Sequence, residues 1–145
     1  MEQLVQEMKV SLASTFVFYL KAHNFHWNVE GPNFPQYHEF LGDLWEETFG
    51  AVDGIAEHLR TLGYFAPGSL SRFNQLSIIQ DEVNIPTAMS MMQKLNSDNT
   101  ELIDQLTKTQ GLAEQEKKMG LANYLQDRID AHEKHGWMLR STLKG

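Results

Sequence analysis

Four side chains in the first half of the chain have the types and spacing of a metal site. His26 and His38 flank a turn-forming segment, Gly31-Pro32-Asn33, and Asp53 and Glu57 follow at a spacing of four residues. That spacing places both carboxylates on one face of a helix. Imidazole and carboxylate ligands suit iron, manganese or zinc. Because the sequence contains no cysteine, any bound metal must be held by such nitrogen and oxygen atoms.

Turn-forming residues divide the chain into helical segments. Apolar residues recur at helical spacing between these breaks, and the strand signal is negligible. We predict four long helices and one short one, over residues 2–29, 33–62, 69–79, 86–109 and 112–143. The short helix falls in a long connection, which ferritin-like bundles have and simple up-down bundles lack. The expected fold is all-α, a ferritin-like four-helix bundle forming a single domain over residues 1–145.

Four residues mark expected helix ends. Asn33 is a candidate N-cap for the second helix, and Pro35 is tolerated in the first turn. Gly63 is the expected C-cap of that helix. Gly111 predicts the turn between the last two helices.

Helix length separates the histidines from the carboxylates. His38 and Asp53 are 15 residues apart on one predicted helix, which corresponds to roughly 22 Å along its axis. One chain therefore carries either two unrelated half-sites or two halves that a second subunit completes. A two-fold axis near Glu46 and Glu47 would lay two such helices antiparallel. The histidines of one chain would then face Asp53 and Glu57 of the other, across the commonest type of oligomer interface.

The charge and hydropathy of the chain disfavour some functions. The net charge is −7, and the twelve Lys and Arg residues are scattered, with Lys117-Lys118 as the densest cluster. Nucleic-acid-binding proteins usually carry a basic stripe or tail. No signal peptide is visible, and the most apolar early run, Phe16 to Leu20, is too short to span a bilayer. We expect a soluble, cytoplasmic protein without a membrane partner.

Other side chains of interest have a structural interpretation. We expect the remaining histidines to have structural roles, namely His23, His58, His132 and His135. The tryptophans are expected to be core aromatics, namely Trp27, Trp45 and Trp137. The methionines at positions 89, 91, 92 and 119 are expected to fill the core or an interface.

The sequence resembles the Dps family, the mini-ferritins also called DNA-binding proteins from starved cells. The similarity lies in His26 to Phe34, His38-Glu39, Asp53 to Glu57, Ser69 to Phe73 and Glu133 to Trp137. These segments match the family in residue type and spacing, and the helices and crossover together cover nearly the whole chain. The block from residue 24 to residue 63 carries most of the resemblance.

The resemblance implies a hollow homo-oligomer of twelve subunits, built from two-fold dimers. It also implies an iron-oxidising centre shared within each dimer, where Fe(II) is oxidised by hydrogen peroxide, preferred in the family, or by dioxygen. By this resemblance, the iron ligands are expected to be His26 and His38 of one subunit with Asp53 and Glu57 of its partner. Trp27 matches a family aromatic near the centre. Ferric oxide would collect in the cavity and the protein would protect against oxidative damage, with zinc as a possible substitute metal.

One departure from the family lies beside the second histidine. The family usually has an Asp four residues after it, where this chain has Gly42, followed by Asp43. One residue on a helix is about 100° of rotation, so Asp43 is a candidate ligand only with a local distortion that Gly42 permits. Otherwise water or Glu46 completes the site, or the site is weaker. A metal-binding cage of the same fold with little or no ferroxidase turnover is therefore the main alternative function.

The second departure is the missing Lys-rich tail. DNA-compacting family members commonly use one, so we expect no DNA retardation near about 0.15 M salt, and a DNA-compacting protein is the disfavoured alternative.

Glu133 aligns with an acidic residue of the family's three-fold pore, and Asp127 and Asp130 lie near it on the last predicted helix. These three residues predict either an acidic path for Fe(II) or an ordinary charged helix face.

Overall fold

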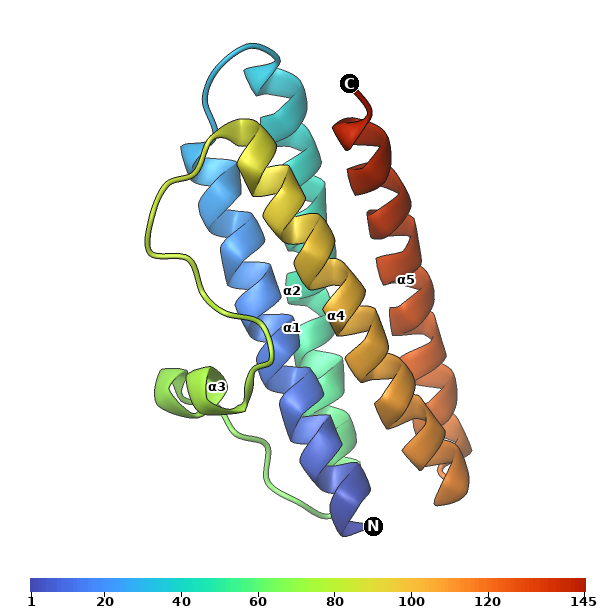
Figure 1. Ribbon diagram of the computed structural model, residues 1–145. Coiled ribbons are helices and arrows are strands. Elements are labelled where there is room, and N and C mark those ends of the chain that lie inside the picture. The colour runs from blue at the N-terminus through green and yellow to red at the C-terminus, as the bar shows by residue number, and fades with distance from the viewer.

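The computed structural model describes all residues, 1–145, and contains five helices and no strands (Figure 1). They are α1 (Glu2–Asn28), α2 (Phe34–Thr61), α3 (Leu70–Leu76), α4 (Ala88–Gln115) and α5 (Met119–Leu143). The predicted all-α bundle with a short helix in its crossover is confirmed. None of the helices is long and apolar enough to cross a membrane.

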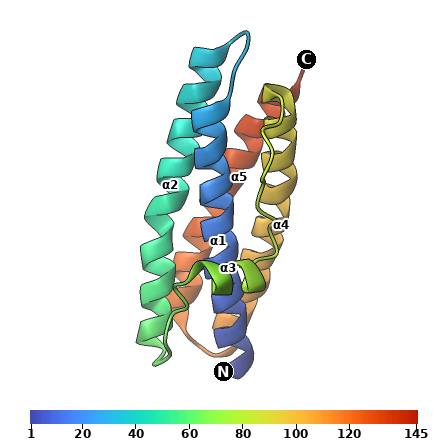
Figure 2. The ribbon, with the colours of Figure 1, turned by 90° about the vertical axis from the view of Figure 1, so that its left-hand side faces the viewer.

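The four long helices run side by side and α3 lies across their outside (Figures 1 and 2). A tight turn joins α1 to α2, so these two helices are antiparallel neighbours, and α4 and α5 form a second antiparallel pair. The crossover returns the chain from the end of α2 to the opposite end of the bundle, where α4 begins (Figure 2). This topology explains why the second connection is long.

The bundle core is formed by one apolar stripe from each long helix. Leu4, Met8, Leu12 and Phe18 of α1 are almost completely buried, at the spacing of one helix face. Equivalent positions are filled on α2 by Leu41, Leu44, Ile55 and Leu59, and on α4 by Met91, Met92 and Leu95. The tryptophan prediction was partly wrong, because Trp27 and Trp137 are 59% and 58% exposed in the single chain.

The ends of α2 largely follow the sequence signals. Gly63 has φ +95 and Tyr64 donates its backbone N–H to the Leu59 carbonyl, 3.1 Å away, so a left-handed glycine ends the helix as predicted. Asn33 holds the N-cap position and Pro35 lies in the first turn, as expected. The Asn33 side chain makes no capping hydrogen bond, however, because its backbone is left-handed with φ 68.

The turn predicted at Gly111 was wrong, because α4 continues through this glycine to Gln115. Ala113 is completely buried and extends the apolar stripe of α4 past Gly111. The helix ends instead with Lys117 in the left-handed conformation, φ 59, and Lys118 donates to the Ala113 carbonyl at 2.9 Å. A lysine takes the position that glycine usually fills, so the usual signal is missing from the sequence.

The crossover is anchored to α1 by side chains. Lys21 Nζ donates to the Gln80 carbonyl at 2.9 Å and pairs with Asp98 of α4 at 2.7 Å. Ser14 Oγ accepts the Ile78 backbone N–H at 3.0 Å. These contacts hold a segment without regular structure against the bundle.

Candidate metal centre

His26 and His38 lie face to face across the α1–α2 turn. Their ring centroids are 3.8 Å apart and the rings are within 14° of parallel. His26 Nδ1 lies 2.7 Å from the His38 carbonyl oxygen, and His38 Nδ1 lies 2.8 Å from the His26 carbonyl oxygen. The turn therefore brings together the two histidines that the sequence singles out.

The reciprocal hydrogen bonds fix the tautomer of both rings. A carbonyl oxygen only accepts, so each Nδ1 must carry the proton and donate it. Nε2 is then the atom of each ring that is positioned to ligate a metal. Metal-ligating histidines are usually oriented by such a second hydrogen bond. The hydrogen bonds thus fix the orientation of both imidazole rings.

Aromatic side chains from α1 and α2 lie beside His26. His23 stacks on Trp45, with centroids 3.8 Å apart and planes 9° apart, and also contacts Trp27 at 4.0 Å. Tyr19 Oη lies 2.9 Å from His23 Nδ1. Burial, and secondarily the neighbouring His26, lower the pKa of His23. This neutral stacked ring packs beside the histidine pair, and Trp27 remains exposed next to it.

Asp53 and Glu57 lie exposed on α2, far from the histidines. The helix is continuous from His38 to Glu57, so the separation of roughly 22 Å along its axis applies. A mainly apolar groove of 460 Å³ between α1, α2 and α3 borders Asp53. No three or more His, Asp or Glu side chains in the chain are grouped so that they could hold a metal. Within the single chain the two histidines and the two carboxylates are therefore separate.

Gly42 and Asp43 have different surroundings. A Cβ atom on Gly42 would lie 3.1 Å from His26 Cε1 and 3.2 Å from His26 Nδ1, so this position directly adjoins the histidine pair. Asp43 instead lines a pocket between α2 and α5, together with Glu47 and His135. The structure brings Gly42, rather than Asp43, next to His26.

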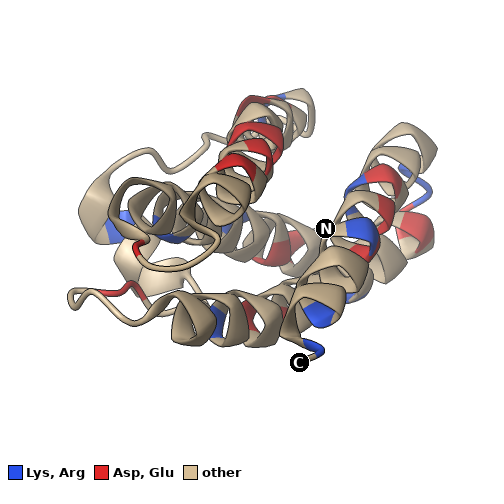
Figure 3. Cartoon of the chain, turned by 90° about the horizontal axis from the view of Figure 1, so that it is seen from above, with Lys and Arg blue, Asp and Glu red and all other residues tan.

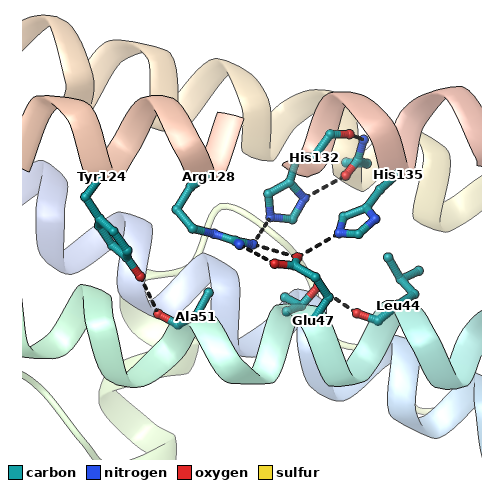
Figure 4. A network of polar contacts seen from close by, with 9 residues as sticks. Leu44, Glu47, Ala51, Tyr124, Arg128, His132 and His135 are labelled. Atoms are coloured by element: carbon teal, nitrogen blue, oxygen red, sulfur yellow. Dashed lines mark hydrogen bonds and ion pairs between the residues drawn. The ribbon is translucent and has the colours of Figure 1, made fainter. Parts of the chain in front are cut away.

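A buried polar network connects α2 with α5 and was not predicted from the sequence (Figure 4). Arg128 forms a two-pronged ion pair with Glu47, and its Nη2 atom lies 3.0 Å from Glu47 Oε1. The same Nη2 lies 3.1 Å from His132 Nε2. His135 Nε2 lies 2.8 Å from Glu47 Oε1. His132 and His135 thus have the structural role expected for them, although their partners could not be foreseen.

Asn99 of α4 fixes the tautomer of His132. Its Nδ2 donates to the His132 carbonyl at 2.8 Å, so its Oδ1 accepts from His132 Nδ1, also at 2.8 Å. His132 Nε2 therefore accepts the Arg128 proton. Burial, with Arg128 nearby, lowers the pKa of His132 well below its ordinary value of 6.5. Hydrogen bonds from His135 and Arg128 outweigh partial burial and lower the pKa of Glu47.

Gly54 has no side chain, which leaves room for the Tyr124 side chain to pack against α2. Tyr124 Oη donates to the Ala51 carbonyl at 3.1 Å, and a Cβ atom on Gly54 would lie only 2.4 Å from that hydroxyl oxygen. The ring also packs against His58 at 4.6 Å. This contact fixes α5 against the turn of α2 that carries Asp53.

The three pore candidates are exposed on α5. Asp127, Asp130 and Glu133 recur every three residues, a spacing that keeps them on one side of the helix. Lys and Arg are dispersed among the helices and do not gather on one face (Figure 3). The charge pattern is thus acidic overall, without a basic surface.

Comparison with known proteins agrees with this architecture. A family model described as a ferritin-like domain matches residues 6–145. The chain is 33% identical over 134 residues to the DNA protection during starvation protein of Brevibacillus brevis, covering 92% of this chain and 89% of that protein. It is 32% identical over 142 residues to antigen TpF1 of Treponema pallidum, covering 97% and 80%.

Solved structures show the same fold. Dps from Staphylococcus aureus superimposes with a TM-score of 0.95 at 29% identity, covering all of this chain and 97% of the other. The Dps protein of Vibrio cholerae, described as a member of a broad superfamily of ferritin-like diiron-carboxylate proteins, gives 0.94 at 26% identity, covering 99% and 90%.

The chain therefore belongs to the ferritin-like family. Within that family it is a member of the Dps group, as the similarity of sequence and structure over almost the whole chain shows.

Proposed function

We propose that this protein oxidises and stores iron at a centre shared between two-fold-related subunits. His26 and His38 of one chain supply the nitrogen ligands, and Asp53 and Glu57 of a second chain supply the oxygen ligands. The observation that carries the proposal is the reciprocal pair of hydrogen bonds that leaves Nε2 free on both histidines. The same two bonds hold both rings in fixed orientations, as the outer hydrogen bonds of metal-ligating histidines do.

The ligand types fit the change in iron charge. Carboxylate oxygens are hard, negatively charged ligands, and their attraction grows with the charge of the ion. Asp53 and Glu57 would therefore stabilise Fe(III) more than Fe(II), while the imidazoles of His26 and His38 would orient the incoming ion. With hydrogen peroxide as oxidant the reaction balances when two Fe(II) ions and one peroxide give two Fe(III) ions and two hydroxide ions. Consuming both reactants protects the cell from oxidative damage.

A cage follows from the same proposal. Antiparallel α2 helices in a dimer bring each half-site opposite the other, and a dodecamer of such dimers would enclose the oxidised iron.

Asp127, Asp130 and Glu133 are proposed to line the path for Fe(II), since they share one side of α5. Particle mass in solution measures the assembly. Asp127→Asn together with Glu133→Gln is expected to slow iron uptake several-fold without changing that mass.

Mixed dimers test the shared centre. His38→Ala removes one half-site and Asp53→Ala removes the other, and each variant alone is expected to oxidise Fe(II) at least about tenfold more slowly. Dissociating, mixing and reassembling the two variants leaves one intact centre in every mixed dimer. Random pairing should then restore about a quarter of the wild-type rate.

The matched control mixes His38→Ala with His26→Ala. Both changes fall in the same half of the centre, so no mixed dimer contains an intact site and no activity should return. Recovery in the control as well as in the test mixture would rule out a shared centre. Lack of recovery in both mixtures, with correct assembly by mass, would have the same consequence.

A metal-binding cage without efficient turnover is the second candidate function, and Gly42 is the observation that favours it. No carboxylate extends from the position beside His26. A Dps structure from Listeria innocua was soaked with zinc, and zinc is a plausible resident ion for a site of this ligand type. Anaerobic loading with Fe(II) followed by peroxide, monitored by absorbance, separates the two functions. Oxidation within seconds supports ferroxidase activity, and stable Fe(II) binding without oxidation supports the cage.

DNA compaction is not part of the proposal, although relatives are named for DNA protection. The acidic chain lacks a basic surface, and phosphate contacts require one. A gel-retardation experiment near about 0.15 M salt is expected to show free DNA.

A further inference from the structure

The side chains around Arg128 have the composition of a metal site with a guanidinium at its centre. Glu47 and His132 contact Arg128 directly, and His135 contacts Glu47, from two facing helices, α2 and α5 (Figure 4). As they lie around the guanidinium, the three side chains are not grouped closely enough to hold a metal. One carboxylate and two imidazoles are a common ligand set for divalent transition metals. The cation present is Arg128, which is 6% exposed and always protonated.

Arg128 Nη2 contacts two of the three groups, and the third contacts one of those two. It lies 3.0 Å from Glu47 Oε1 and 3.1 Å from His132 Nε2, and His135 Nε2 lies 2.8 Å from the same Glu47 oxygen. Metal–ligand distances are about 2.0–2.2 Å, so Glu47 and His132 would need to move inward by about 1 Å, and His135 would need to turn from Glu47 toward the ion. Rotation of the Glu47 and His135 side chains can supply such a shift, because Glu47 is 38% exposed.

The orientation of His132 is also that of a metal ligand. Asn99 holds the proton on His132 Nδ1, which directs the Nε2 lone pair at Arg128. An outer hydrogen bond of this kind is what usually fixes a ligating imidazole. His135 Nε2 donates to Glu47 in the wild-type chain, so it would ligate through this atom only in the tautomer that carries the proton on Nδ1.

One hydrogen-bond donor of Arg128 has no partner. Its Nε atom is buried and makes no hydrogen bond. An uncompensated donor of this kind carries a desolvation cost. A pocket of 290 Å³ lined by Asp43, Glu47, Lys134 and His135 reaches the network from the surface, so an ion from solvent has access to Glu47 and His135.

We propose that Arg128 is a built-in cation that occupies a latent metal site formed by Glu47, His132 and His135 and keeps it closed to metal. The site is intrachain and separate from the His26–His38 pair. Its closure would confine Fe(II) to the centre between subunits, and only this consequence depends on the proposed function. The prediction is that removing the guanidinium creates a metal site where the wild-type chain has none.

Cobalt binding tests the proposal in the assembled protein. Arg128→Ala removes the cation and leaves space for an ion. Under anaerobic conditions we expect this variant to bind one more Co²⁺ per chain than the wild type, with visible d–d absorption typical of four- or five-coordinate cobalt. The thermal unfolding midpoint of the variant should rise on adding Co²⁺ by more than that of the wild type.

Two matched variants locate the additional ion. Arg128→Leu removes the charge but fills the space with an apolar side chain, and Arg128→Ala/His132→Leu opens the space but removes a ligand. Neither should bind the additional Co²⁺. Binding of that ion by either variant would overturn the proposal, because the ion would then lie elsewhere. The comparison is always with the wild type, so it is unaffected by whether the centre between subunits binds cobalt or oxidises iron.

Arg128→Gln is the second opening variant, in case the alanine variant does not fold by itself. Glutamine removes the charge and retains a hydrogen-bonding group, and it too should gain a Co²⁺ site that His132→Leu abolishes. Folding of Arg128→Ala only when Co²⁺ is present would also support the proposal. If either variant folds with an unchanged helical content and binds no more Co²⁺ than the wild type, Arg128 does not occupy a latent metal site.

Discussion

The histidine pair at the α1–α2 turn and the network around Arg128 use the same kinds of side chain in opposite ways. At the turn, backbone carbonyls take the Nδ1 protons of His26 and His38, and both Nε2 atoms stay unused. In the network, the Nε2 atoms of His132 and His135 are both engaged, by Arg128 and by Glu47.

The difference shows that residue type alone does not define a metal site. An imidazole is available as a ligand when a hydrogen bond holds Nδ1 and Nε2 has no partner. An imidazole instead stabilises the fold when its Nε2 is held by a buried cation, as in His132, or by a carboxylate, as in His135. The predictions below test whether the turn is the functional half of this comparison and the network the structural half.

The largest expected effect concerns Glu47. Glu47→Gln removes the counter-charge of the buried Arg128 and is expected to lower the free energy of unfolding by about 3 kcal/mol, at the low end for a buried pair because Glu47 is partly exposed. Urea denaturation measures this change. The control is Glu101→Gln on the exposed side of α4, which should change the free energy by less than about 0.5 kcal/mol. Equal effects for the two variants would show that the network contributes no stability.

Gly54→Ala is expected to have the next largest effect. The added Cβ would lie 2.4 Å from Tyr124 Oη, and overpacking of this kind costs about 2 kcal/mol. Gly50→Ala is the control on the same helix, because nothing lies within 4 Å of its Cβ position. It should stabilise α2 by up to about 1 kcal/mol. Adding Tyr124→Phe to Gly54→Ala should recover part of the loss, and no recovery would mean that the hydroxyl is not the obstacle.

Gly42→Asp sharpens the comparison at the histidine pair. The new carboxylate would lie beside His26, where a Cβ has contacts of 3.1 and 3.2 Å to the ring. Gly42→Ala introduces the same crowding without the carboxylate and is the matched control. We expect Gly42→Asp to bind Fe(II) about tenfold more tightly than Gly42→Ala, or ~1.4 kcal/mol, by anaerobic titration. Equal affinities would indicate that another group already supplies the ligand.

The smallest expected effect is a pH dependence from His132. Its pKa in the folded chain is below the ordinary 6.5, so below pH 6.5 the unfolded chain binds a proton that the folded chain does not. The free energy of unfolding should therefore fall as the pH is lowered from about 7.5 to 5.5. His132→Gln should remove about 1 kcal/mol of that decrease. His23 and His58, whose pKa values are also lowered, contribute equally to both proteins. Identical pH profiles would exclude His132 as the group responsible.

The fold was largely predictable from local signals. Helical spacing of apolar residues and the left-handed Gly63 defined most helix boundaries to within a few residues. The exception was the last turn, where Lys117 adopts a conformation that its residue type does not announce. The meeting of His26 with His38 was also predictable, because only a short turn separates their helices.

The network was not predictable because its partners are distant in sequence. Glu47 and Arg128 are 81 residues apart, and nothing local indicates that they meet. A weaker signal was present in α5. Leu121, Leu125, Arg128, His132, His135 and Leu139 recur at spacings of three and four residues. Charged and polar side chains on such a stripe point into the core, where they must find partners.

The anchoring of the crossover by Lys21 has a consequence for the order of folding. The α1–α2 and α4–α5 hairpins form from contacts between neighbouring helices, which are fast to establish. Lys21 contacts both the Gln80 carbonyl and Asp98 of α4, so its buried position is complete only after the two hairpins have docked. The segment from residue 77 to residue 87 should consequently be cleaved by proteases in undocked chains and protected in docked ones. Its protection would report the late, non-local step of folding separately from helix formation.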